Sequence, residues 1–159
     1  MERAALLDTS FILRLLNEND PLCNNAEGYY RYFLEKKISL IISTIATGEY
    51  CVKGKLSELP LKDLQILPYN LSHSVKAGEF AGILFDKKAL GELDIDRKLI
   101  PNDVKMFAQA NVEDKIGYYV TSDGESEKMI MTLSGELKLN FEIINIKIPY
   151  SERFGLLDL

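Results

Sequence analysis

Four acidic residues stand at predicted strand ends or on predicted helices: Asp8, Glu49, Asp103 and Asp123. Asp8 follows the apolar run AALL, Asp123 follows IGYYVT after Ser122, and a helix is predicted after each. Ligands of open α/β sheets bind beyond the carboxyl ends of the strands, so neighbouring AALL and IGYYVT strands would let all four acids converge. Converging carboxylates repel each other, which implies a divalent cation. An all-oxygen ligand set without Cys or His favours Mg²⁺ or Mn²⁺.

Each aspartate also has a purely structural explanation. Asp8 and Asp123 are both suited to capping the helix that follows, although the hydroxyl of Thr9 or Ser10 could cap the first helix without a charge. Asp103 lies in the first turn of a helix, where an acid is stabilised by the helix dipole. The sequence leaves both explanations open for each residue.

Glu49 is harder to explain structurally. In a helix, positions 45, 49, 52 and 56 share one face, and here they hold Ile45, Glu49, Val52 and Leu56. A glutamate on a buried apolar face needs a partner or a metal ion, because desolvating it alone costs several kcal/mol. The alternative is that this face lies at the domain edge and that Glu49 reaches water.

Composition excludes several other kinds of chemistry. His73 is the only histidine, so no mechanism can use two imidazoles, and no G-x-S-x-G motif is present. Cys23 and Cys51 have no metal-ligand spacing and form no disulfide framework, which favours a reducing cytoplasm. No apolar run is long enough to span a bilayer, and the first residues do not resemble a signal peptide. The net charge of −5 argues against a protein with a basic coat, but not against a nuclease with an acidic metal site.

The hydrophobic pattern predicts one α/β domain over residues 1–159, with a parallel sheet between helices. Strands are expected at 4–7, 38–43, 64–67, 116–121 and 141–148. Helices are expected at 9–17, 28–37, 44–54, 72–90, 100–115 and 125–137, and the tail at 149–159 is unassigned. In the helix at 72–90, Val75, Phe80, Ile83 and Leu84 are expected on one apolar side.

Four segments resemble, in order, the four acidic motifs of the PIN-domain ribonucleases. They are LLDTSFILRLL, ISTIATGEYCVKG, IPNDVKMFAQA and YYVTSDGES, and the likeness runs from about Leu6 to the last strand. The resemblance implies a three-layer fold with a five-stranded parallel sheet and hydrolysis of RNA dependent on Mg²⁺ or Mn²⁺. It also implies that the catalytic and metal-binding residues are Asp8, Glu49, Asp103 and Asp123. Ser10 and Thr121 are expected to contact these acids rather than the metal ion.

Many members of that family are toxins of VapC type, which a small antitoxin protein silences, and many are homodimers. An antitoxin partner and a homodimer are therefore expected beside the RNA substrate, with no membrane partner. This sequence departs from the family where VKMFAQA follows Asp103 and where GESEKMI follows in place of an aromatic after Asp123. A PIN-like binding module with weak or no catalysis is the alternative. A response-regulator receiver is disfavoured, because LLDTS supplies a single acid and no middle strand ends in an aspartate.

Overall fold

The computed structural model of the chain describes residues 3–156. Its centre is a five-stranded sheet in the order β3-β2-β1-β4-β5, in which every neighbouring pair is parallel. The strands are β1 (Ala4–Leu7), β2 (Ser39–Ser43), β3 (Leu64–Leu67), β4 (Ile116–Thr121) and β5 (Glu142–Asn145). The predicted α/β class with a parallel sheet is therefore confirmed.

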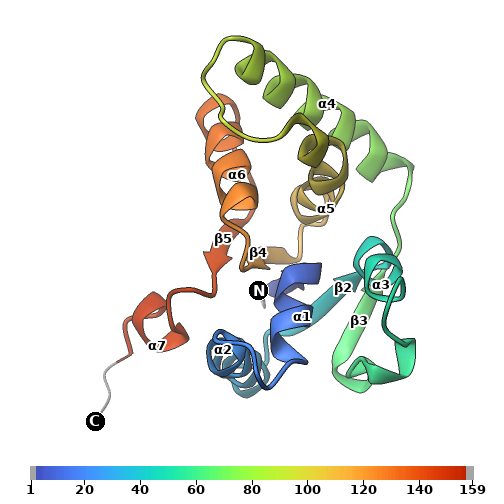
Figure 1. Cartoon of the computed structure of the whole chain (residues 1–159), viewed down its shortest axis with the longest axis vertical. Helices are drawn as coiled ribbons and strands as arrows, with labels where there is room; N and C mark the ends of the chain where they lie inside the picture. Colours follow the sequence, from blue (N-terminus) through green and yellow to red (C-terminus); the bar gives the residue numbers. More distant parts are fainter. Residues whose placement is uncertain (1–2, 157–159) are drawn as a thin grey trace.

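Helices cover both faces of the sheet. They are α1 (Thr9–Leu15), α2 (Cys23–Glu35), α3 (Thr44–Tyr50), α4 (Leu71–Ala89), α5 (Ile100–Val112), α6 (Gly124–Glu136) and α7 (Tyr150–Arg153). Figure 1 shows α4, α5 and α6 in the upper half of the molecule, and α1, α2, α3 and α7 in the lower half. Chain direction explains this division. The crossovers from β1 through β2 to β3 run one way across the sheet, and those from β3 through β4 to β5 run the other way, so right-handed connections place their helices on opposite faces.

Several predicted boundaries are wrong. The second helix begins at Cys23 rather than at Gly28, the third ends at Tyr50 rather than near Gly54, and the last strand ends at Asn145. Gly28 lies inside α2, where a Cβ atom would come within 2.7 Å of the Tyr150 ring. This glycine therefore marks a close approach of α7 to α2 and not a helix start.

Val75, Val52 and Leu56 were predicted on buried apolar faces, and all three are exposed. Val75, expected on the apolar side of its helix, has 68% of its surface exposed, whereas Phe80 and Leu84 on the same helix are buried. Val52 is 78% exposed because α3 ends before it. The unassigned tail contributes α7 as far as the structure describes it.

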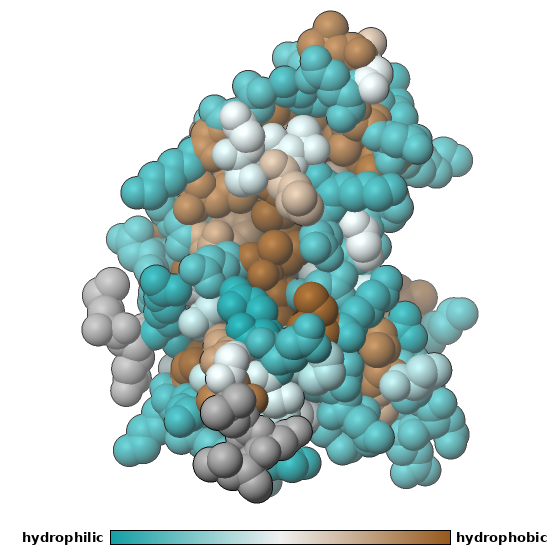
Figure 2. Space-filling view, turned by 90° about the vertical axis from the view of Figure 1, so that its left-hand side faces the viewer, coloured by the Kyte–Doolittle hydropathy of each residue, from teal (hydrophilic) through white to brown (hydrophobic). Residues whose placement is uncertain are grey.

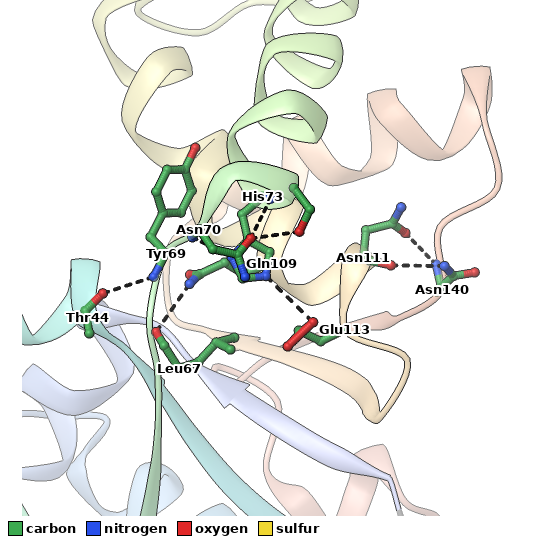
Figure 3. Close-up of polar contacts among 10 residues, drawn as sticks. Thr44, Leu67, Tyr69, Asn70, His73, Gln109, Asn111, Glu113 and Asn140 are labelled. Carbon is green, nitrogen blue, oxygen red and sulfur yellow. Dashed lines mark hydrogen bonds and ion pairs between the residues drawn. The ribbon is translucent and has the colours of Figure 1, made fainter.

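A buried polar cluster joins β3, α4 and α5 (Figure 3). His73 is fully buried, and its Nδ1 accepts a hydrogen bond from Asn70 N at 3.0 Å, while Asn70 Oδ1 accepts from His73 N at 3.1 Å. The His73 Nε2 atom faces the Glu113 carboxylate at 3.7 Å. In α5, Gln109 donates to the carbonyl of Leu67 at 3.4 Å. His73 thus completes the capping box of α4, whose N-cap is Asn70, and Gln109 joins α5 to β3.

An apolar groove runs along the edge of the sheet that β5 forms. Its lining comes from α6, β5 and the loop between them: Ile130, Met131, Ser134, Leu137, Lys138, Leu139, Phe141, Glu142 and Ile143. Figure 2 views the molecule from this side and shows hydrophobic residues gathered near the middle of the face. Within residues 3–156, no helix has the length and apolar character needed to cross a bilayer.

Candidate active site

The candidate site lies at the carboxyl ends of β1 and β4. These strands are neighbours in the sheet, with Leu7 opposite Val120, and the strand order reverses between them. A cavity of about 230 Å³ opens there. It is lined by Asp8, Thr9, Ser10, Leu13, Glu49, Asp103, Met106, Tyr119, Asp123 and Ser126. The structure thus brings the four predicted acids to one place from four separate elements.

Asp8 both caps a helix and lines the cavity. It is the N-cap of α1, and its Oδ1 accepts hydrogen bonds from Phe11 N at 3.0 Å and Ser10 Oγ at 2.7 Å. Only 4% of Asp8 is exposed. Burial raises its pKa from 3.8 to about 6, against the opposing effect of its hydrogen bonds. The structural explanation of Asp8 as an N-cap is therefore confirmed, and the same side chain also lines the cavity.

Asp103 and Asp123 share a hydroxyl. Asp123 is the N-cap of α6, where its Oδ1 accepts from Glu125 N at 2.9 Å. Ser126 Oγ lies 3.4 Å from Oδ2 of Asp123 and 3.4 Å from Oδ2 of Asp103. Burial, reinforced first by the charge of Asp123 and then by that of Asp8, raises the pKa of Asp103 to about 7.

Glu49 reaches the cavity, but the reasoning that singled it out is wrong. The face of residues 45, 49, 52 and 56 is not a buried stripe, because α3 ends at Tyr50 and Val52 and Leu56 are exposed. Glu49 is half-buried, and its Oε1 accepts a hydrogen bond from Asn102 Nδ2 at 3.0 Å. This bond joins α3 to the start of α5 beside the cavity.

Ser10 and Thr121 connect the two strand ends behind the acids. Ser10 Oγ donates to Asp8 and accepts from Ser122 N at 2.9 Å. Ser10 Oγ lies 3.3 Å from Thr121 Oγ1, so the two hydroxyls are within hydrogen-bond distance of each other. Thr121 Oγ1 in turn accepts from Asp123 N at 3.0 Å. The network fixes the backbone after β4 to the first turn of α1.

Three residues of the site were not identified from the sequence. They are the polar residues Asn102, Ser126 and Tyr119. A signal existed for Tyr119, because strand residues 119 and 121 point to the same side as each other and Thr121 was already assigned to the site. Asn102 has no comparable signal, since its partner Glu49 lies on α3. For Ser126, only the contact with Asp123, the N-cap of the same helix, follows from local spacing.

The donor chemistry of the cavity fits a hard divalent cation. Its charged groups are all carboxylates, and no Lys or Arg lines it among the residues that the structure describes. Burial is the main reason that the pKa values of Asp8 and Asp103 are raised, and the charges of neighbouring acids add to the effect. In residues 3–156, however, no three acidic, His or Cys side chains are already close enough together to form a ready-made metal cluster. The acids line the cavity without closing on a single point.

Comparisons with known proteins confirm the fold. No family model matches the chain, and no curated protein matches it. Among solved structures, a chain of VapBC2 from Rickettsia felis bound to a promoter DNA fragment matches at 19% identity and a TM-score of 0.57, over 89% of this chain and 99% of that one. FitAcB from Neisseria gonorrhoeae matches at 12% identity and a TM-score of 0.58, over 91% and 99%.

A third structure is VapC20 from Mycobacterium tuberculosis, described as a toxin that cleaves the sarcin-ricin loop. It matches at 16% identity and a TM-score of 0.55, over 78% of this chain and 93% of that one. The chain therefore has the PIN-like α/β fold that its four acidic motifs implied. Sequence identities this low establish the fold alone, so the activity has to be argued from the residues of the site.

Proposed function

We propose that this protein is an endoribonuclease that hydrolyses RNA phosphodiester bonds with Mg²⁺ or Mn²⁺. The observation that supports the proposal is the convergence of four carboxylates from four elements on one cavity. Among the residues that the structure describes, no Lys or Arg side chain lines that cavity. A divalent ion supplies the missing positive charge and matches all-oxygen ligands. RNA is favoured as the substrate by the resemblance to PIN-domain ribonucleases and by the sarcin-ricin loop that VapC20 cleaves.

In this proposal Asp8, Glu49, Asp103 and Asp123 hold the ion. When bound, the ion lowers the pKa of a water molecule and stabilises the charge that develops on the phosphate. Ser10 orients Asp8 through its 2.7 Å hydrogen bond.

The carboxylates must be ionised to act as ligands. Burial raises the pKa of Asp8 to about 6 and, together with neighbouring charges, that of Asp103 to about 7. Protons and the cation therefore compete for these groups, and the site is complete only above the pH at which both have lost their protons.

The decisive experiment is RNA cleavage with Mn²⁺, with and without EDTA, by the wild-type protein and Asp8→Asn. The control is Asp96→Asn, because Asp96 is also an N-cap aspartate, accepting from Lys98 N at 2.9 Å, but it is exposed and outside the cavity. Cleavage that EDTA stops, that Asp8→Asn loses and that Asp96→Asn keeps supports the proposal. Equal degradation by all three proteins indicates a contaminating nuclease and contradicts it.

We further infer that the protein is the toxin of a toxin–antitoxin pair. The matched VapC20 is described as a toxin, and the matched VapBC2 chain comes from a structure bound to promoter DNA. An open groove also adjoins the acidic cavity, and Leu13, Tyr50 and Val52 contribute apolar surface to it. Induction of the wild-type protein should arrest growth of a bacterial host, and Asp8→Asn should not. Normal growth after induction of an active nuclease would contradict the toxin assignment.

We also propose a homodimer, by analogy with the PIN-domain ribonucleases that the sequence resembles. Analytical ultracentrifugation tests this proposal.

A PIN-like binding module is the second candidate. The spacing of the acids, which lie in one cavity without forming a close cluster in residues 3–156, favours it. RNA binding without cleavage at any Mn²⁺ or Mg²⁺ concentration would establish this candidate and refute the nuclease.

A further inference from the structure

Glu49 is the least firmly placed of the four acids. It is the next-to-last residue of α3, which ends at Tyr50, and it is half-buried. It lines both the acidic cavity and the open groove beside it, whereas Asp8, Asp103 and Asp123 line the cavity and not that groove. A glutamate side chain has several rotatable bonds, so at this boundary its carboxylate can turn toward either space.

A hydrogen bond from Asn102 holds the Glu49 carboxylate. Asn102 Nδ2 donates to Glu49 Oε1 at 3.0 Å. Within residues 3–156, this is the only hydrogen bond or ion pair that the carboxylate makes. The bond occupies one lone pair of Oε1 and leaves Oε2 without a partner in the same part of the chain. A carboxylate held in this way through one oxygen can still bind a cation through the other.

Asn102 belongs to a firmly packed helix. It is the third residue of α5, a helix in which Ile100 and Phe107 are completely buried. The next residue along the chain is Asp103, which itself lines the cavity. The start of α5 therefore places two of the acids, because it carries Asp103 and it holds Glu49 through the amide of Asn102.

An amide is the suitable donor beside a cation site. An Asn side chain donates hydrogen bonds without carrying a charge. A Lys or Arg in its place would pair with Glu49 and compete with a divalent cation, and an Asp would repel the carboxylate. Lys53 lines the adjoining groove, so a Glu49 side chain released by Asn102 has an ammonium group to turn to. The bond from Asn102 opposes that turn at no cost in charge.

We propose that Asn102 is a positioning residue, which holds the Glu49 carboxylate at the cavity so that it binds a divalent cation together with the other three acids. The inference rests on the proposed function for the identity of the bound ion. Asn102 does not bind the ion, and it acts through Glu49. Groups that orient metal ligands in this way change metal affinity about 10- to 100-fold when they are removed. The lower end of this range applies here, because the bond is exposed and water can replace part of it.

The first measurement is the affinity for Mn²⁺ alone, by isothermal titration calorimetry without RNA. It compares the wild type with Asn102→Ala and with the control Asn145→Ala. Asn145 also donates from its amide to a glutamate, Glu127 at 2.8 Å, but neither of these two residues lines the cavity. Asn102→Ala should weaken Mn²⁺ binding about 10-fold, and Asn145→Ala should leave it within about twofold. Unchanged affinity in Asn102→Ala, or equal losses in both variants, would overturn the inference.

A double-mutant cycle with Glu49→Gln shows whether Asn102 acts through Glu49. Glu49→Gln removes the charged ligand, so adding Asn102→Ala to it should change the Mn²⁺ affinity by no more than about twofold. A purely structural role of Asn102 would instead lower the affinity equally with and without Glu49. A further loss of about 10-fold in the Glu49→Gln background would therefore refute the positioning role.

RNA cleavage at several Mn²⁺ concentrations separates this inference from the proposed function. For Asn102→Ala the half-saturating Mn²⁺ concentration should rise about 10-fold, while kcat at saturating Mn²⁺ returns to the wild-type value. If the wild-type protein binds neither Mn²⁺ nor Mg²⁺, the proposed function fails, and the positioning role of Asn102 fails with it. If the wild type binds Mn²⁺ and cleaves RNA but Asn102→Ala binds Mn²⁺ as tightly, the Asn102 inference fails alone.

Discussion

Replacing Asp8 by Asn should stabilise the cation-free protein at neutral and alkaline pH while it abolishes cation-dependent cleavage. Asn is as good an N-cap as Asp, and its Oδ1 can still accept from Phe11 N and Ser10 Oγ. What the substitution removes is a charge that is almost completely buried beside other acids. Function and stability should therefore change in opposite directions at this one position.

The magnitude follows from the pKa of Asp8, which burial raises from 3.8 to about 6. A shift of roughly two units corresponds to about 3 kcal/mol of destabilisation of the ionised form. Weaker hydrogen bonds to a neutral amide offset about 1 kcal/mol of the gain. We therefore expect Asp8→Asn to gain about 1–2 kcal/mol in the free energy of unfolding when Asp8 of the wild type is ionised.

The sign of the pH dependence follows from linkage. The folded state binds the Asp8 proton more tightly than the unfolded state, so the contribution of this group is complete below 3.8 and is lost as pH rises through about 6. The stability of the wild type should fall over this range, and the stability of Asp8→Asn should fall less. The difference between the two proteins should grow from about pH 4 to about pH 7 and then level off.

Urea denaturation in EDTA, followed by circular dichroism at several pH values, measures this difference. Asp96→Asn is the control, because it makes the same change at an exposed cap and should give no comparable gain. An Asp8→Asn protein that is less stable than the wild type near pH 8 without cation would refute the reasoning. So would a difference that does not depend on pH.

Three further predictions concern the cation, His73 and Gly28. Mn²⁺ affinity, measured by calorimetry, should rise with pH as the two acids with pKa values near 6 and 7 lose their protons, and a flat profile would contradict their role as ligands. His73→Phe leaves the Asn70 N–H without its 3.0 Å acceptor and should lower the free energy of unfolding by about 1–3 kcal/mol in urea denaturation, with cleavage by the folded protein unchanged. Gly28→Ala places a Cβ within 2.7 Å of the Tyr150 ring and should destabilise the protein by about 1–3 kcal/mol in the same assay, whereas Gly48→Ala, which meets nothing within 4 Å, should be neutral or stabilising.

The strands of the sheet were largely predictable because they depend on local pattern, whereas the strand order was not predicted. Short apolar runs such as AALL and SLIIS have the composition of strands covered on both faces, and segments with helical periodicity lie between them. Boundaries were less predictable. Gly28 has the sequence signature of a helix break, and only the approach of Tyr150 from the far end of the chain shows why a glycine lies inside α2.

In the candidate site, too, some features follow from the sequence and others only from the tertiary structure. The sequence by itself determined which residues carry charge. It also determined that Asp8 and Asp123 follow strands, because strand ends and helix starts depend on the types of neighbouring residues along the chain. Tertiary structure decided that Glu49 meets Asn102 and that Asp103 meets Ser126. Those contacts join elements far apart in the chain, and their geometry is set by how the helices pack on the sheet, which no local pattern specifies.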